Sequence, residues 1–335
     1  MIPQTTTIKT YQNWQQALAD TVNTAEELLH LLGLSGLVPV LDKDKLGDFP
    51  VRVPRSYVNK MRYGDPTDPL FRQVFPFTDE GHLVEGYSSD PVGDHQAIKT
   101  PGILHKYQGR ALLLMTGACA IHCRYCFRRH FPYSDSNPLA SQWQQSLNAI
   151  AADTSIREVI LSGGDPLSLT DKKLAAAVED LATIPHLKRL RIHTRLPVVL
   201  AERVTDSLQD WIRHSRLKVV MVIHANHQNE LDEATAHAID LLKQAGVQML
   251  NQTVLLKGIN NSVDTLVALS ERLNEIDVMP YYIHLLDKVA GAHHFDMDEA
   301  EAVKLIDETR KLLPGYLVPR LVREQQGEAS KTIIR

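Results

Sequence analysis

Three cysteines close together in the sequence are the residues best suited to chemistry in this chain. Cys119, Cys123 and Cys126 are the only cysteines among 335 residues, and they lie within eight positions. An odd number of cysteines cannot pair off into an internal disulfide framework. Thiolates at spacings of four and three can instead converge on one inorganic centre, and small neighbours such as Gly117 and Ala120 let the backbone approach that centre closely.

The number of cysteines bears on which centre they hold. Three thiols that pack only as small hydrophobes are not expected in a polar, arginine-rich loop. A structural zinc site stays open, since His122 or His130 could complete a Cys₃His set. An iron-sulfur cubane would keep one iron open, because the chain has no fourth cysteine. An open iron can bind a reactant directly, so the count favours catalysis over electron transfer.

The composition is that of an ordinary folded protein. At 37.6 kDa, with 44% apolar and 23% charged residues, the chain suits one large barrel with an appendage, or two domains. Lys and Arg number 36 and Asp and Glu 40, and the net charge of −4 has the wrong sign for coating nucleic acid. The chain has no membrane-spanning apolar run, and its first residues do not resemble a signal peptide. We therefore expect a cytoplasmic protein with no nucleic-acid or membrane partner.

Strand-like and helix-like segments alternate after about residue 110. Before that point the sequence predicts helices and loops, including an amphipathic helical stretch from Asn13 to Leu34. Short apolar runs predict strands at 111–115, 158–161, 190–193, 219–223, 249–256 and 281–285. Amphipathic stretches predict helices at 172–184, 201–213, 231–245, 263–276 and 298–313.

This alternation predicts an α/β fold with βαβ units around a parallel sheet. Six units suit a partial (β/α)6 barrel of the TIM type, in which the chemistry gathers at the carboxyl ends of the strands. We expect a helical N-terminal extension over residues 1–100, the barrel over 101–320 and a short C-terminal tail over 321–335. The cysteine loop follows the first predicted strand, at the end where such sites occur.

The cysteine spacing and several longer segments carry a family resemblance. Cys-x₃-Cys-x₂-Cys after a strand, in a chain of βα repeats, resembles the radical S-adenosylmethionine (SAM) superfamily. The segments 125–129, 161–167, 195–200, 251–256 and 280–282 are similar to the lysine 2,3-aminomutase family within it. The resemblance covers about residues 57–331 and is strongest to the short form that supplies β-lysine for modification of elongation factor P.

The resemblance implies three cofactors. A [4Fe-4S] cluster would be held by Cys119, Cys123 and Cys126, and its open iron would chelate SAM, which is cleaved to a 5′-deoxyadenosyl radical. The residues expected to bind SAM are Ser162, Gly163, Gly164, Asp165, His224 and Gln252. Pyridoxal 5′-phosphate would be held by Lys331 as the catalytic lysine, with Tyr107 and Arg110 beside it. Longer family members carry a glycine run before this lysine, whereas the matching loop here has only Gly327.

The resemblance also implies a substrate and a reaction. Arg128 would pair with the carboxylate of L-lysine, and Asp287 and Glu324 with its distal ammonium, although Glu324 is longer than the family's residue there. The α-amino group would move from C2 to C3 to give (R)-β-lysine, which a separate ligase attaches to elongation factor P. An electron donor is required, and a homo-oligomer is compatible with the resemblance.

Two alternatives differ from this interpretation. Because Glu324 and the C-terminal tail depart from the family, another amino acid such as glutamate is a second candidate substrate. In a different class, a Cys₃His zinc loop would make the chain an interaction module.

Overall fold

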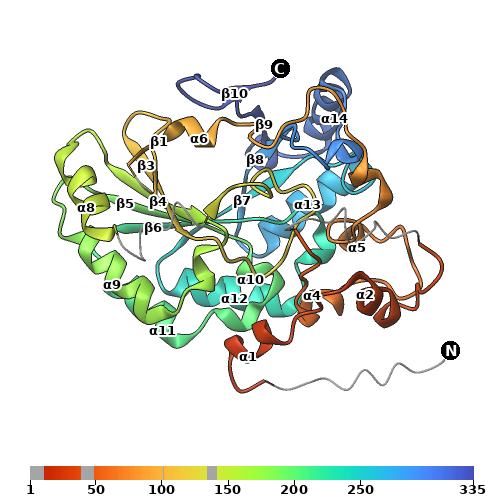
Figure 1. Cartoon of the computed structure of the whole chain (residues 1–335), viewed down its shortest axis with the longest axis horizontal. Coiled ribbons are helices and arrows are strands. Elements are labelled where there is room, and N and C mark those ends of the chain that lie inside the picture. The colour runs from red at the N-terminus through yellow and green to blue at the C-terminus, as the bar shows by residue number, and fades with distance from the viewer. Residues whose placement is uncertain (1–10, 39–48, 101, 134–141) are drawn as a thin grey trace.

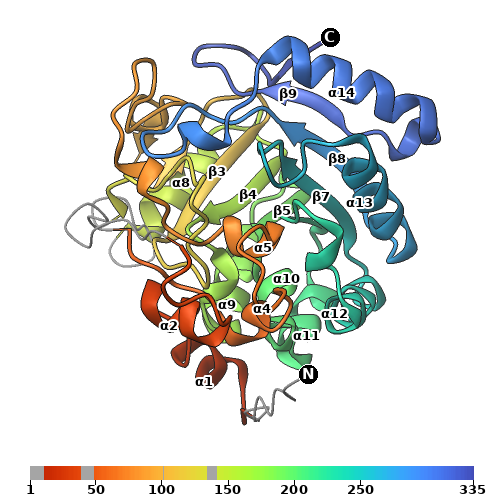
Figure 2. The ribbon, with the colours of Figure 1, turned by 90° about the vertical axis from the view of Figure 1, so that its right-hand side faces the viewer.

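One curved sheet forms the centre of the molecule. The computed structural model describes residues 11–38, 49–100, 102–133 and 142–335. Within these ranges ten strands join side by side in chain order from β1 to β10. The parallel strands are β3 (Arg110–Thr116), β4 (Glu158–Gly163), β5 (Arg189–Thr194), β6 (Lys218–Ile223), β7 (Gln248–Val254), β8 (Met279–His284) and β9 (Arg320–Arg323). Figure 2 shows the strands curving around the middle of the molecule.

Short antiparallel strands extend both edges of the sheet. β1 (Ile98–Thr100) and β2 (Ile103–Leu104) precede β3, and β10 (Thr332–Ile333) pairs with β9. Figure 1 shows β10 and the C-terminus on the same side of the molecule as α6 (Asp94–Ala97) and β1. Gln326 Nε2 donates to Gln96 Oε1 at 2.7 Å, which joins the segment before β10 to α6. The sheet therefore includes residues on both sides of the predicted boundaries at residues 100 and 320. The division into three regions stays a prediction.

Helices cover the outer face of the parallel strands (Figures 1 and 2). The longer ones are α8 (Trp143–Ala152), α9 (Asp171–Ala182), α11 (Asp206–His214), α12 (Glu233–Gln244), α13 (Val263–Glu275) and α14 (Glu299–Leu312). In α9 the buried residues Leu174, Ala177, Val178 and Leu181 have the i, i+3, i+4, i+7 spacing of one apolar face. The predicted α/β fold with a partial TIM-like barrel is confirmed, although the sequence interpretation missed α8.

The N-terminal part consists of short helices and loops. These helices are α1 (Trp14–Ala19), α2 (Ala25–Leu31), α4 (Arg55–Val58) and α5 (Pro69–Arg72). The amphipathic stretch from Asn13 to Leu34 forms two helices, because the chain leaves the helix between α1 and α2. Val22 pairs there with Val53 through two backbone hydrogen bonds of 2.8 and 2.9 Å, and the Thr24 side chain caps α2. No helix in the described ranges is long and apolar enough to span a membrane.

Candidate functional site

A cavity of about 530 Å³ lies inside the curve of the sheet. Residues at the carboxyl ends of strands β3 to β9 line it, as expected for a βα barrel. The structure brings every residue predicted for the site to this one cavity: Tyr107, Arg110, Cys119, Cys123, Cys126, Arg128, Ser162, Gly163, Gly164, Asp165, His224, Gln252, Asp287, Glu324 and Lys331. Their individual roles stay predictions, whereas their common location is a feature of the fold.

The glycine pair at the end of β4 packs against the backbone of the cysteine loop. Gly164 N donates to Thr116 O at 2.7 Å, and a Cβ on Gly164 would lie 2.4 Å from Ala118 O. Gly163 has a φ of +121°, and a Cβ there would lie 2.5 Å from Thr116 O. Larger residues would push the cysteine loop away from β4, so these glycines position the loop in addition to their predicted contact with SAM.

The N-terminal part holds the cysteine loop from the other side. Glu80 accepts from Arg124 Nη2 at 2.5 Å and from Arg129 Nη2 at 3.0 Å, and Arg124 is 0% exposed. His122 Nδ1 lies 2.8 Å from Pro50 O, and its ring stacks on Phe49 with 4.7 Å between centroids. These contacts fix the loop between segments that are distant in the sequence.

The two histidines of the zinc alternative have other partners. His122 binds the Pro50 carbonyl, and His130 Nε2 lies 3.3 Å from Ala290 O. Across the described part of the chain, no group of three or more His, Cys, Asp or Glu side chains is arranged to hold a single metal ion. A Cys₃His zinc site is therefore not supported. A cubane differs, because it spreads its three thiolate ligands over three irons.

The environment of the thiols suits an iron-sulfur cluster. Cys119, Cys123 and Cys126 are free thiols that line the cavity. Burial raises the pKa of Cys119, and it raises the pKa of Cys126 to about 11. Thiolates in this low-dielectric place therefore need positive charge beside them, which a cluster's iron ions would supply.

A buried arginine that sequence reasoning did not single out also contacts a cysteine. Arg195 Nη1 donates to Cys123 Sγ at 2.7 Å, and its Nη2 donates to Glu230 Oε2 at 2.7 Å. Arg195 is 6% exposed and Glu230 is 0% exposed. The position of Arg195 directly after the strand predicted at 190–193 could have indicated it, because polar residues at that end of a barrel strand face the site.

The residues predicted to bind SAM differ in how far protein groups already engage them. Asp165 accepts from Thr194 Oγ1 and from the backbone N–H of Arg195, each at 2.7 Å, so it joins the β4 and β5 loops. His224 Nε2 lies 2.8 Å from Tyr125 OH, and burial lowers the pKa of His224 to about 3, which keeps the imidazole neutral. The contact of each with SAM stays a prediction.

Lys331 lies beside two half-buried carboxyl groups. Its Nζ donates to Glu324 Oε2 at 2.5 Å, and Glu324 Oε1 lies 3.3 Å from Lys106 Nζ. Burial alone would raise the pKa of Glu324, but Lys331 and Lys106 outweigh it and lower the pKa to about 2. Burial raises the pKa of Asp287 to about 7, and neighbouring Glu324 adds to this, although Lys331 opposes it.

The charged chain continues to Arg128 through two residues that were not predicted. Lys106 Nζ pairs with Asp94 Oδ1 at 2.5 Å, and Arg128 Nε donates to Asp94 Oδ2 at 2.6 Å. Arg128 Nη1 also donates to Ser162 Oγ at 3.1 Å. Lys106 directly precedes Tyr107 in the sequence, but no sequence signal marked Asp94. Arg110 stacks over the Tyr107 ring at 4.6 Å.

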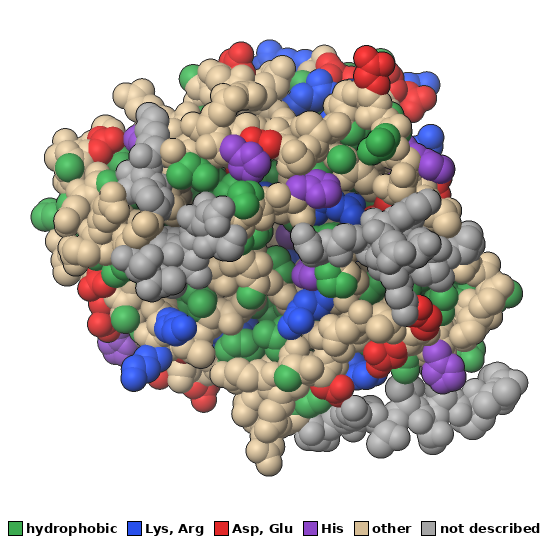
Figure 3. Space-filling model, viewed as in Figure 1, with side chains coloured by type: hydrophobic (Ala, Val, Ile, Leu, Met, Phe, Trp, Pro, Cys, Tyr) green, Lys and Arg blue, Asp and Glu red, His purple; other side chains and the backbone are tan. Residues whose placement is uncertain are grey.

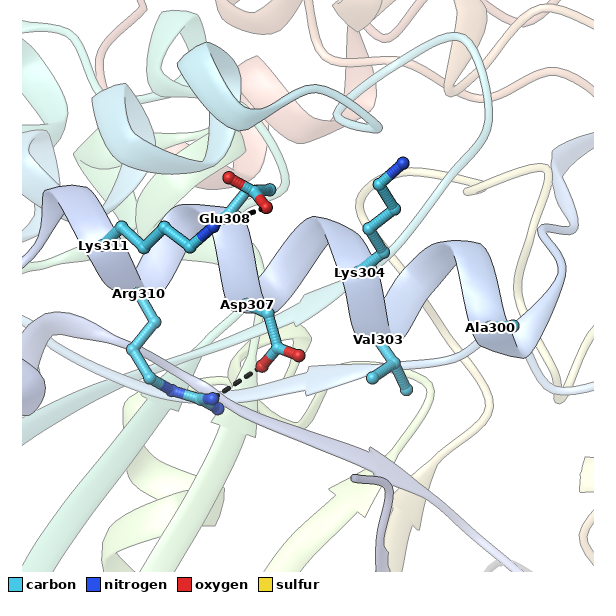
Figure 4. Close-up of a pocket in the computed structure, with 7 residues that line it drawn as sticks. All are labelled: Ala300, Val303, Lys304, Asp307, Glu308, Arg310 and Lys311. Carbon is cyan, nitrogen blue, oxygen red and sulfur yellow. Dashed lines mark hydrogen bonds and ion pairs between the residues drawn. The ribbon is translucent and has the colours of Figure 1, made fainter.

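A second hollow, on the outside of α14, lacks such features. Figure 4 shows its lining side chains projecting from a single helix, with ion pairs between Arg310 and Asp307 and between Lys311 and Glu308. These pairs are exposed and three residues apart on one helix, and pairs of this kind contribute little to stability.

On the face in Figure 3, histidine side chains gather near the middle of the molecule.

The cysteine loop, the glycine pair and the curved parallel sheet define a class of protein. The sequence model of the radical SAM superfamily matches residues 113–269. A solved spore photoproduct lyase with bound AdoMet matches 60% of this chain and 72% of its own, at 16% identity and a TM-score of 0.41. This distant likeness carries no weight in the assignment.

Curated relatives identify the family within that class. The L-lysine 2,3-aminomutases of Escherichia coli K12 and Haemophilus influenzae Rd are 46% and 45% identical to this chain, covering 96% and 99% of it and 94% and 98% of their own lengths. The enzyme of that name from Acetoanaerobium sticklandii is 32% identical over 96% of this chain and 78% of its own length. The chain belongs to the L-lysine 2,3-aminomutase family, and it is a radical SAM isomerase. The family implies a [4Fe-4S] cluster and SAM.

Proposed function

We propose that the chain moves the α-amino group of L-lysine from C2 to C3 and so forms (R)-β-lysine. The observation that carries the proposal is the sequence of charges along the cavity wall, in which Asp94 and Lys106 separate Arg128 from Glu324, and Glu324 and Asp287 lie beside Lys331. An amino acid with an anionic head and a cationic tail matches that order. The family names of the relatives point to the same substrate.

Cys119, Cys123 and Cys126 would hold the cluster, and Lys331 would hold pyridoxal phosphate with Tyr107 and Arg110. The cluster and SAM supply a carbon radical that can take a hydrogen atom from an unactivated C–H bond, and pyridoxal phosphate supplies a π-system for amino-group transfer. Arg110 has no ion-pair partner within the described ranges and lines the cavity, so its charge is available for the phosphate group.

Arg128 would bind the substrate carboxylate while Asp94 holds its side chain in place. The 2.6 Å contact between Arg128 Nε and Asp94 occupies one N–H group of the guanidinium. N–H groups on the Nη atoms can donate to a carboxylate. Arg128 is almost completely buried, with 9% of its side chain exposed. A fixed, desolvated guanidinium orients its ligand well, which is a positioning role.

Lys331 itself indicates how the other end would bind an ammonium. In this structure its Nζ, an ammonium on a methylene chain, donates to Glu324. It also lies close enough to Asp287 to oppose the rise in the pKa of that carboxyl. A lysine substrate presents the same group. We infer that cofactor attachment withdraws Lys331 from Glu324 and frees this carboxylate for the substrate ammonium.

The use of the product in modifying elongation factor P, by a separate ligase, belongs to the same proposal and rests on the resemblance to the short family form. Glutamate is the second candidate substrate, because Glu324 differs from the family's residue. Its distal carboxylate would, however, face the carboxyl groups of Asp287 and Glu324, and Lys106, 3.3 Å from Glu324, favours the ionised form of Glu324 after Lys331 has been withdrawn. This repulsion favours lysine.

The test is product analysis under anaerobic conditions. Reconstituted, reduced enzyme with SAM and pyridoxal phosphate should convert L-lysine into β-lysine, with the (R) isomer identified by chiral chromatography. L-glutamate serves as the matched substrate control. Preferential turnover of glutamate would overturn the substrate assignment, and absence of deoxyadenosine with either amino acid would overturn the radical reaction.

A further inference from the structure

Arg195 forms a direct polar contact to one of the three cysteine sulfurs. Its Nη1 donates to Cys123 Sγ at 2.7 Å and also to Tyr125 OH at 2.8 Å. Tyr125 lies between Cys123 and Cys126, so one guanidinium nitrogen is held against the middle of the cysteine loop. An N–H···S contact of this kind withdraws electron density from a thiolate ligand.

The guanidinium is fixed by a set of partners that leave it little freedom. Arg195 Nη2 donates to Gln73 Oε1 and Glu230 Oε2, each at 2.7 Å, and to Tyr57 OH at 3.1 Å. Gln73 and Tyr57 come from the N-terminal part of the chain and Glu230 follows β6. Partners from the N-terminal part, the cysteine loop and the segment after β6 therefore fix the position of this one guanidinium.

The charges of this pair persist in the buried site. Burial alone would raise the pKa of Glu230, but Arg195 and hydrogen bonds from Asn226 and Gln73 lower it. Glu230 is therefore an anion that pairs with the Arg195 cation, and Arg195 is the member of the pair that contacts Cys123. A cluster on the three cysteines would experience the nearer positive charge, reduced by the more distant negative one.

We propose that Arg195, held by Glu230, is a positioning residue that raises the reduction potential of the cluster through its hydrogen bond to Cys123 and its charge. Both effects stabilise the more negative, reduced cluster. The inference rests on the proposed cluster site at Cys119, Cys123 and Cys126. Loading of the wild-type protein with iron and sulfide tests that site separately.

The experiment is an EPR-monitored redox titration of the reconstituted full-length protein without SAM. Arg195→Gln removes the charge and the N–H···S contact, so its midpoint potential should be more negative than that of the wild type. Glu230→Gln removes the opposing anion and should shift the potential in the positive direction. The double variant removes the hydrogen bond at unchanged net charge, so its potential should lie between those of Arg195→Gln and the wild type.

Arg203→Gln is the matched control. Arg203 is likewise buried, with 0% exposed, and is paired with Asp171 at 2.7 Å, but it does not line the cavity. Its variant should keep the wild-type potential, while melting curves report the folding of all four variants. Equal potentials in wild type, Arg195→Gln and Glu230→Gln would overturn the inference, as would shifts of the same sign in the two single variants. If Arg195→Gln cannot be loaded, an unshifted Glu230→Gln overturns the inference. A wild-type protein that takes up no cluster would instead refute the proposed function.

Discussion

The cavity has two ends that are built in different ways. Its cysteine end comes from one loop after β3, which backbone contacts hold against β4 and the N-terminal part. Its lysine end combines side chains from α6, from the segment before β3 and from the segment between β9 and β10. There, ion pairs between side chains link Asp94, Lys106, Glu324 and Lys331.

This difference indicates how each end responds to change. The cysteine loop depends on glycine where it packs closely against β4 and on the buried ion pairs that Glu80 forms with Arg124 and Arg129. A chain of charges at a partly desolvated site depends on its members, because removal of one leaves a partner such as the buried Asp94 carboxylate less compensated. The two ends should therefore be separable by mutation.

The largest effect is expected at the cysteine end. Changing Cys119, Cys123 or Cys126 to Ala should abolish the cluster and bring aminomutase activity below detection, because three thiolates are the minimum for this site. Iron and sulfide analysis with the visible spectrum measures the loss. Wild-type colour in any one of these variants, or colourless wild-type protein with stoichiometric zinc, would contradict the cluster assignment.

Lys331→Ala should abolish activity equally but leave the iron-sulfur spectrum intact. Borohydride reduction of the loaded wild type, followed by peptide mapping, should find a pyridoxyl group on Lys331. Lys304, exposed on the outer face of α14, provides a control substitution that should keep full label. A label on a different lysine would refute the assignment.

The carboxylate and ammonium contacts should have intermediate effects. Arg128→Ala and Asp287→Ala should each lower kcat/KM for lysine by about 10- to 100-fold, the range for lost charge-assisted hydrogen bonds. The cluster content should not change. Lysine turnover by Asp287→Ala at the wild-type rate would show that the ammonium binds elsewhere.

A smaller effect concerns pH. Because the pKa of Asp287 is raised to about 7, this group loses its charge as the pH falls from 8 to 6, and the KM for lysine should rise over that range. The steepest dependence expected is about tenfold per pH unit. Glu324→Gln should weaken binding and move this pH dependence to lower pH, because the Glu324 charge helps to raise the pKa of Asp287. A slope that survives in Asp287→Asn would assign the titration to another group.

The smallest effect is expected outside the cavity. Lys311→Ala breaks an exposed ion pair with Glu308 on α14 (Figure 4). The free energy of unfolding should change by no more than about 0.5 kcal/mol, and activity should not change. Urea denaturation of apoprotein measures the first quantity, and a large loss of activity would show that the outer hollow has a role.

Much of the architecture followed from local patterns. Short apolar runs, separated by amphipathic stretches, predicted β3 to β8. The strands of a parallel sheet that is covered by helices are rich in apolar residues. The run at 249–256 was too long by two residues at its end, since β7 stops at Val254. The missed α8 has no charged residue, and its exposed polar residues are the amides Gln144, Gln145 and Asn148. The split between α1 and α2 depended on the pairing of Val22 with Val53, which no local pattern reveals.

The sequence by itself determined the cysteine loop, its position after the first barrel strand and, by resemblance, the residues of the candidate site. Cysteine spacing is a local property, so the chain carries it wherever it folds. Only the tertiary structure decided which charges meet: Asp94 pairs with Arg128 across 34 positions, and Lys106 with Glu324 across 218. The contact of Arg195 with Cys123 spans 72 positions. The energy of such contacts depends on distance in space and on burial, and both arise only when the strands have closed around the cavity.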